Sequence, residues 1–127
     1  MGSEEFQKRL SQELDKMKTI QKNMQKAMAA KQTLDGQLSE NNVVKEELNF
    51  LTPENKVYKM TGPVLVEQEI DEAKQNVEKR IMFITSEIKR NDEVLKDLSN
   101  QQDKQQEILQ RLQKEFADEQ QLKSVKK

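Results

Sequence analysis

The fold is decided by one short apolar stretch, Lys56-Val57-Tyr58-Lys59-Met60-Thr61-Gly62-Pro63-Val64-Leu65-Val66, which interrupts two long helical patterns. β-Branched and aromatic residues are frequent on both sides of a Thr-Gly-Pro run that supplies turn chemistry. The stretch therefore predicts a single β-hairpin. Because a two-stranded hairpin is at best marginally stable alone in water, we expect other subunits to supply further strands.

An ordered loop packed on the chain's own helices is the alternative interpretation of this stretch. We favour pairing between subunits, because it satisfies the edge N–H and C=O groups of a hairpin that has no core of its own. It also buries both faces of the hairpin. Its apolar side chains are Val57, Tyr58, Met60, Val64, Leu65 and Val66.

Composition indicates an extended molecule. Of the 127 residues, 33% are hydrophobic and 35% are charged, which is too lean for a compact core of that size. The 22 Lys and Arg and the 23 Asp and Glu are interspersed and give a net charge of -1. Neither nucleic acid nor an anionic membrane is therefore expected as a partner.

The sequence lacks the residue types that most often serve in catalysis and metal binding. The sequence holds no Cys and no His, which are the usual transition-metal ligands and include the commonest nucleophile and general base. It also lacks a glycine-rich phosphate loop. We therefore expect no enzyme activity, no metal and no cofactor. No apolar run is long enough for a signal peptide or a membrane span, so we expect a soluble, cytoplasmic protein.

The first helix is predicted from Glu4 to about Phe50, with apolar residues at alternating steps of three and four. With Phe6 at heptad position d and Leu10 at position a, nine of the 13 a and d positions, here called the seam, are apolar. Gly36 predicts a local weak point, and Thr52-Pro53 ends the helix. The seam positions are Phe6, Leu10, Glu13, Met17, Ile20, Met24, Ala27, Lys31, Leu34, Leu38, Asn41, Lys45 and Leu48.

The second helix is predicted to begin in the acidic run 67–72, where carboxylates suit the positive end of the helix dipole. Ten of its 16 seam positions are apolar, and we expect it to fray in the basic tail from Lys123 to Lys127. The seam positions are Ile70, Lys74, Val77, Ile81, Ile84, Ile88, Asn91, Leu95, Leu98, Gln102, Gln105, Leu109, Leu112, Phe116, Glu119 and Lys123.

A short connection predicts that the second helix folds back antiparallel on the first in a two-helix coiled coil. Folding about residue 59 pairs position i with roughly 118 minus i, which brings the aromatic ends of both helices together. We name these residues the tip cluster: Phe6, Leu10, Leu109, Leu112 and Phe116. They either close the coiled coil or, because few side chains surround a two-helix end, remain available to partners.

The chain thus divides into three parts, a coiled-coil helix over 1–51, a hairpin assembly module over 52–66, and a second coiled-coil helix over 67–127. This order resembles the β class of prefoldin subunits. The hairpin run 57–66, followed by Glu72-Ala73 and Lys79-Arg80, is similar to the hairpin signature of that family. Residues 39–48 and 87–90 resemble its flanking segments, so the similarity covers nearly the whole chain.

The resemblance implies a mainly α subunit in a hexamer of two α-class and four β-class subunits, whose hairpins form an intersubunit β-barrel platform. It also implies an ATP-independent co-chaperone that holds unfolded proteins, such as actin and tubulin, at its coiled-coil tips and delivers them to the cytosolic group II chaperonin. By this resemblance the tip cluster is the candidate for client or chaperonin contact. The resemblance assigns assembly to Val57, Tyr58, Gly62, Pro63, Val64, Leu65 and Val66.

A structural coiled-coil spacer or tether is the competing hypothesis. Such a protein homodimerises through a parallel seam, and neighbouring Ile residues at a and d positions favour higher oligomers of the second helix. The two hypotheses differ in whether the hairpin is needed for assembly.

Overall fold

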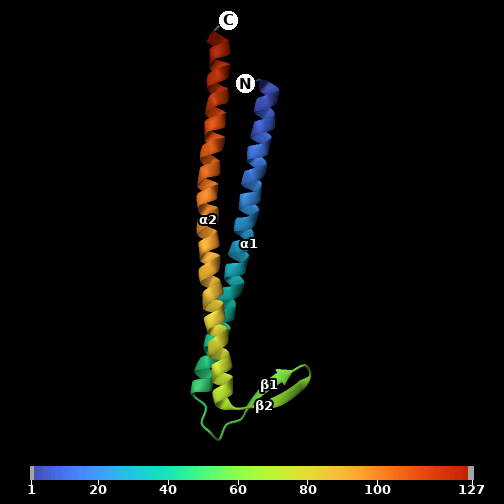
Figure 1. The fold of residues 1–127 in the computed structure, drawn as a ribbon, viewed down its shortest axis with the longest axis vertical. Helices are drawn as coiled ribbons and strands as arrows, with labels where there is room; N and C mark the ends of the chain where they lie inside the picture. The colour runs from blue at the N-terminus through green and yellow to red at the C-terminus, as the bar shows by residue number, and fades with distance from the viewer. Residues whose placement is uncertain (1, 126–127) are drawn as a thin grey trace. The chain divides into compact units, whose positions relative to one another are not determined.

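The structure, a computed structural model, describes residues 2–125, and these residues form two helices and one hairpin in the expected order (Figure 1). Helix α1 spans Ser3–Asn49 and helix α2 spans Ile70–Val125. Strands β1 (Val57–Thr61) and β2 (Val64–Gln68) lie between them in the chain. The mainly α helix–hairpin–helix prediction is confirmed.

The described residues divide into two compact units. The terminal unit contains residues 2–28 and 93–125, and the hairpin unit contains residues 29–92. Both units pair α1 with α2 in antiparallel orientation. In the terminal unit Phe6 lies against Phe116 and Glu13 contacts Gln105. In the hairpin unit, ion pairs join Lys31 to Asp92 at 3.2 Å and Lys45 to Glu78 at 3.4 Å.

Burial of the seam positions against the opposing helix stabilises both helices. In α1, 12 of the 13 predicted seam positions are buried or half-buried, and Lys45 is exposed. In α2, 15 of the 16 are buried or half-buried, and Lys123 is exposed. Residues between the seam positions are mostly polar and exposed, as expected of an amphipathic helix with one apolar stripe. The heptad prediction is therefore confirmed.

The two strands form a two-stranded antiparallel sheet in which Thr61 pairs with Val64 and Val57 with Gln68. Gly62 and Pro63 connect the strands. Gly62 has a φ of +61°, and the ring of Pro63 holds its own φ negative. A positive φ at the first central position and a negative φ at the second define a type II′ turn, whose twist matches that of the flanking strands.

Helix α1 ends through local backbone bonds just before the loop to β1. The N–H of Phe50 donates to the carbonyl of Glu47 at 3.1 Å, which tightens the last turn. A turn around Pro53 follows, because the N–H of Asn55 donates to the carbonyl of Thr52 at 3.0 Å. The side-chain oxygen of Asn55 accepts a bond from the N–H of Thr52 at 2.8 Å in return.

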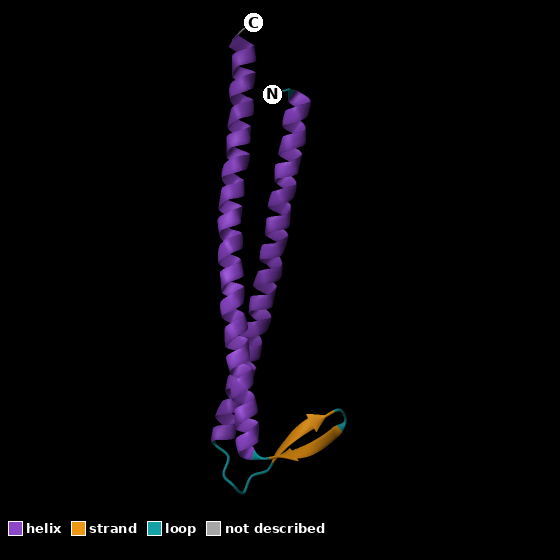
Figure 2. Ribbon diagram, viewed as in Figure 1, coloured by secondary structure: helices purple, strands orange, loops and turns teal. Residues whose placement is uncertain are grey.

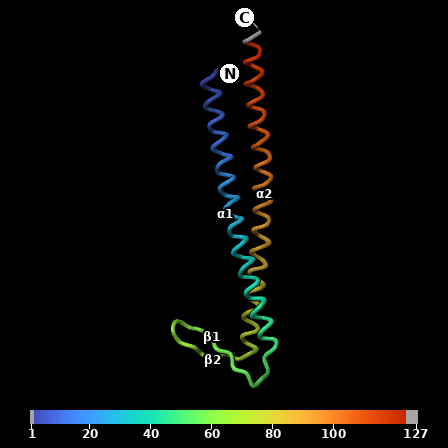
Figure 3. The backbone as a smooth tube through the Cα atoms, turned by 180° about the vertical axis from the view of Figure 1, so that it is seen from behind, coloured from blue at the N-terminus to red at the C-terminus, as the bar shows by residue number. Residues whose placement is uncertain are grey.

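The hairpin joins the helices through a small apolar core in which Leu48, Ala73 and Val77 are buried. Val57, the first residue of β1, packs against this core together with Leu51 and Ile81. Figures 2 and 3 show the rest of the hairpin extending away from the neighbouring helix ends.

Strand β2 is longer than expected and α2 begins later. Glu67 and Gln68 belong to β2, opposite Tyr58 and Val57, so the acidic run 67–72 is divided between strand and helix. Cross-strand pairing takes these residues because both partners lie in β1, whereas Asp71 and Glu72 stay in the first turn of α2. The α2 helix continues to Val125, and Lys126 and Lys127 of the expected frayed tail lie outside the described residues.

Neither helix, over the residues described, combines enough length and apolarity to span a membrane.

Candidate functional site

The hairpin presents apolar side chains on both of its faces. Cross-strand register places Tyr58, Met60, Leu65 and Glu67 on one face, which we call face A. The opposite face, face B, carries Val57, Lys59, Thr61, Val64, Val66 and Gln68. Exposure is high on face A, at 52% for Tyr58, 72% for Met60 and 63% for Leu65.

The two faces differ in how much the chain itself covers. Val57 anchors the root of face B on the chain's own apolar core, while Val64 and Val66 of that face remain 57% and 49% exposed. No large apolar side chain of face A belongs to that core among the described residues. Within this chain, face A is therefore the face whose apolar side chains are less covered.

Sequence reasoning missed a second group of exposed apolar residues in the hairpin unit. Phe50 is 81% exposed, Met82 73% and Phe83 66%, and Val43 is exposed as well. Continuing the heptads places Val43 and Phe50 at position f and Met82 and Phe83 at positions b and c, which a two-helix coiled coil leaves in solvent. Apolar residues at these positions are the signal that identifies such a surface.

The tip cluster is brought together as predicted. The rings of Phe6 and Phe116 stack with centroids 4.1 Å apart and an angle of 16° between their planes. Leu112 is only 2% exposed, and Leu10, Leu109 and Phe116 are half-buried. Antiparallel pairing about the hairpin therefore places the two aromatic ends as expected.

Of the two interpretations of the tip cluster, closure of the coiled coil fits the structure, and the alternative in which both Phe rings are poorly buried does not. Phe6 is 6% exposed, because the stacked ring of Phe116 covers its face. The tip cluster closes the coiled coil here, and its assignment to client or chaperonin contact remains a prediction.

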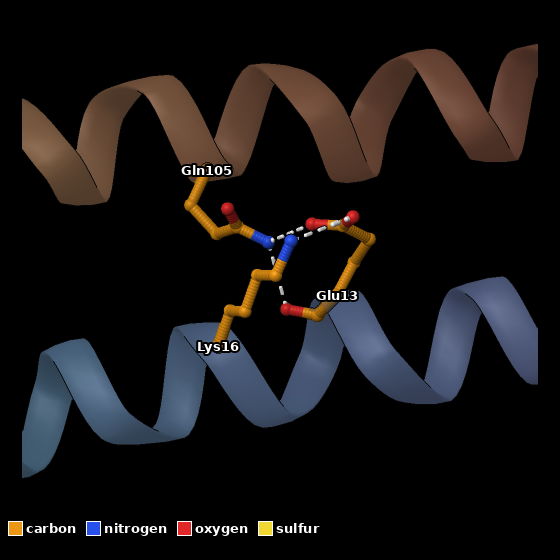
Figure 4. Close-up of polar contacts among 3 residues, drawn as sticks. All are labelled: Glu13, Lys16 and Gln105. Carbon is orange, nitrogen blue, oxygen red and sulfur yellow. Dashed lines mark hydrogen bonds and ion pairs between the residues drawn. The ribbon is translucent and has the colours of Figure 1, made fainter.

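A polar contact crosses the seam of the terminal unit (Figure 4). Gln105, which is 6% exposed, donates from Nε2 to the backbone carbonyl of Glu13 at 2.8 Å and to its Oε2 at 2.6 Å. Lys16 lies 3.4 Å from the other carboxylate oxygen. The hydrogen bond from Gln105, followed by the bond and charge of Lys16 and by the charge of Arg9, lowers the pKa of Glu13 below its ordinary value, although burial opposes the shift.

An open groove of about 550 Å³ adjoins this contact. Ile20 and Thr19 line it from α1, and Gln101, Lys104 and Gln105 line it from α2. Asp15, Lys16 and Lys104 are the charged residues that line it.

Antiparallel helices that carry one exposed hairpin between them define the class of protein, a helix–hairpin–helix arm in which the hairpin is the candidate assembly surface. The family model for prefoldin subunits matches residues 11–116. The chain is 48% identical to prefoldin subunit 6 of Mus musculus over 114 residues, which cover 90% of both chains. It is 38% identical to prefoldin subunit 6 of Arabidopsis thaliana over 109 residues, 86% of this chain and 84% of that one.

A solved structure agrees on the fold. The prefoldin beta subunit from Thermococcus strain KS-1 matches with a TM-score of 0.74 and 20% identity, over 80% of this chain and 90% of that one. The chain belongs to the prefoldin subunit family. Members of this family are chaperone components that form oligomers with other prefoldin subunits.

Proposed function

We propose that the protein is one subunit of a hexameric, ATP-independent co-chaperone in the cytoplasm. Its partners are α-class and β-class prefoldin subunits. The assembly captures unfolded proteins, such as actin and tubulin, at its coiled-coil tips and delivers them to the cytosolic group II chaperonin. Membership of the prefoldin subunit family supports the chaperone role.

The observation that carries the assembly role is the exposure of a hairpin whose two faces both hold large apolar side chains. Met60 and Leu65 are opposite one another on face A and are 72% and 63% exposed. Two strands with free edges attract further strands, and a sheet closed by neighbouring hairpins removes the edges while it covers one face. Hairpins from neighbouring prefoldin subunits therefore cover face A.

A face-specific pair of variants tests this role. Met60→Lys with Leu65→Lys places two charges on face A, where burial of an unpaired charge opposes assembly. We expect the variant, coexpressed with the other subunits, to lose the hexamer peak in native mass spectrometry. The helicity of the variant chain, measured in isolation, is expected to equal that of the parent, because both replaced side chains are exposed.

Thr61→Lys with Gln68→Lys is the matched control, because it adds the same two charges to face B. We expect it to keep most of the hexamer. A hexamer that survives the face A charges would exclude the hairpin from assembly. Equal loss in both variants would instead contradict the choice of face A.

Client contact is proposed for the tip cluster. Helix ends open at a lower free energy than the interior of a coiled coil, and opening would release the Phe6 and Phe116 rings. Phe6→Ser with Phe116→Ser is expected to spare the hexamer and to weaken the suppression of client aggregation, measured by light scattering. Unchanged suppression would remove the tip from the client site.

A coiled-coil spacer or tether is the second candidate function. The burial of Phe6 and Leu112 favours it, because a tether needs a closed end rather than apolar surface for clients. A tether would keep its oligomeric state when face A carries two lysines, so the hairpin variants also separate these candidates.

A further inference from the structure

The contact between Glu13 and Gln105 is a polar layer inside an apolar seam. Both residues occupy d positions, and both are largely shielded from solvent, at 6% exposure for Gln105 and 13% for the side chain of Glu13. On either side of this layer the d positions are apolar, with Phe6 and Ile20 on α1. A polar pair at such a position lowers the stability of a coiled coil and gives it a preferred alignment.

We propose that Gln105 and Glu13 are positioning residues that fix the alignment of α1 against α2 in the terminal unit. The apolar seam alone does not fix this alignment, because the d positions one heptad away are also apolar and would pack after a shift. A slip of one heptad places the carboxylate of Glu13 opposite Leu98 or Leu112. The same slip places the amide of Gln105 opposite Ile20 or Phe6, and both placements bury a polar group without a partner.

Gln105 carries more of this alignment than Glu13 does. Its Nε2 reaches two acceptors on Glu13, and one of them is the backbone carbonyl, which survives any substitution of the Glu13 side chain. Glu13→Leu therefore leaves one of the two bonds in place, whereas Gln105→Leu removes both. Lys16 lies 3.4 Å from the other carboxylate oxygen of Glu13 (Figure 4).

The alignment matters most at the aromatic end. Phe6 precedes Glu13 by one heptad, so the alignment at Glu13 also decides which residue Phe6 meets on α2. In the observed alignment Phe6 stacks on Phe116. If the tip cluster contacts clients, as proposed above, this contact also determines the arrangement of the client surface. That last step rests on the proposed function, whereas the alignment itself does not.

Paired spin labels measure the alignment directly in the full chain. The sequence has no native cysteine, so Lys8→Cys and Lys114→Cys, both at exposed positions, take labels without a competing thiol. Excess unlabelled chain suppresses distances between molecules. We expect one narrow distance distribution for the parent sequence.

Glu13→Leu with Gln105→Leu is the test variant. Replacing a polar layer by Leu is expected to raise the melting temperature, followed by circular dichroism, while a second distance population appears. A one-heptad slip displaces the helices by about 10 Å along their axes. Gln105→Leu alone is expected to give more of the second population than Glu13→Leu alone.

Gln102→Leu is the matched control, because Gln102 is the neighbouring seam glutamine and takes no part in the bonds to Glu13. It is expected to keep the single distance. A single narrow distribution in the double variant would overturn the proposal, and so would equal broadening in the control. Client aggregation is not part of this measurement, so failure of the chaperone role would leave its result unchanged.

Discussion

The terminal unit and the hairpin unit differ in how far their most exposed apolar side chains reach into solvent. In the terminal unit Leu112 is 2% exposed and Phe6 6%, and the exposed apolar residues of its described part stay at or below the 60% of Leu122. The hairpin unit leaves Phe50, Met82 and Met60 more than 70% exposed. Both units gain free energy from apolar burial within the chain, but the exposed side chains of the hairpin would gain it only against a neighbour.

The hairpin unit has a buried core of its own, formed by Leu48, Ala73 and Val77. Ala73 and Val77 contribute short side chains to it, and Val57 is the hairpin residue that packs against it. The comparison leads to a rule that mutations can test. Changes in the terminal unit should alter the stability of the chain by itself, and changes in the hairpin should act mainly on assembly.

Leu112→Ala is expected to have the largest effect on the isolated chain. Leu112 is the most completely buried large side chain among the described residues, and such a truncation in a core costs about 2–5 kcal/mol. The end of a two-helix pair relaxes more easily than a globular core, so the low part of that range is expected. Urea unfolding followed by circular dichroism measures the change.

Leu65→Ala supplies the comparison for that prediction. Leu65 is 63% exposed on face A, and exposed substitutions change stability by about 0.5 kcal/mol or less. An equal loss of stability in both variants would contradict the division between the two units.

Gly62→Ala should weaken the hairpin with little effect on the helices. The φ of Gly62 is +61°, and no atom lies within 4 Å of an added Cβ, so the penalty comes from the backbone alone. That penalty is roughly 1–2 kcal/mol for a residue with a side chain. We expect faster amide exchange in 57–68 and a lower affinity for partner subunits, with unchanged helix unfolding. An assembly as tight as that of the parent would contradict the dependence on the hairpin.

Gly36→Ala should have a smaller effect and the opposite sign. Gly36 lies within α1, and an added Cβ there meets nothing within 4 Å. The substitution is expected to stabilise the helix by about 1 kcal/mol at most. Gly36 lies in the hairpin unit but outside the hairpin, so a higher melting temperature with unchanged assembly would show that the effect on assembly is confined to the hairpin itself. A lower melting temperature would show that the position needs glycine for a reason other than space.

The seams, the hairpin and the antiparallel pairing of the two helices follow from the sequence. Steps of three and four residues decide which side chains face the opposing helix, and the short hairpin connection makes the helices antiparallel. Pairing of i with roughly 118 minus i places residue 13 opposite residue 105, and these residues are in contact. Phe6 and Lys31 instead meet Phe116 and Asp92, about one helical turn beyond the partners that this rule predicts.

Other features depend on contacts that a heptad pattern does not contain. The heptad pattern left open whether the tip cluster is closed or exposed, and the burial of Phe6 comes with its stacking on Phe116. The negative charge of Glu67 favours a position at the start of a helix. Its pairing with Tyr58 instead places it in β2. The sequence prediction considered the a and d positions. It therefore missed the exposed apolar residues at positions b, c and f, which include Phe50, Met82 and Phe83.

The smallest predicted effect is a pH response confined to the terminal unit. Gln105 and Lys16 lower the pKa of Glu13 in the folded chain relative to its ordinary value of 4.5, and Arg9 adds a weaker attraction. A carboxyl whose pKa falls on folding stabilises the fold above the unfolded pKa. This stabilisation is lost as the pH falls through the folded pKa. The urea midpoint of the parent should therefore decrease more than that of Gln105→Leu when the pH drops from above 4.5 to below it. Identical pH profiles would show that the amide of Gln105 does not stabilise the ionised carboxylate, and the alignment would then rest on the bond to the backbone carbonyl alone.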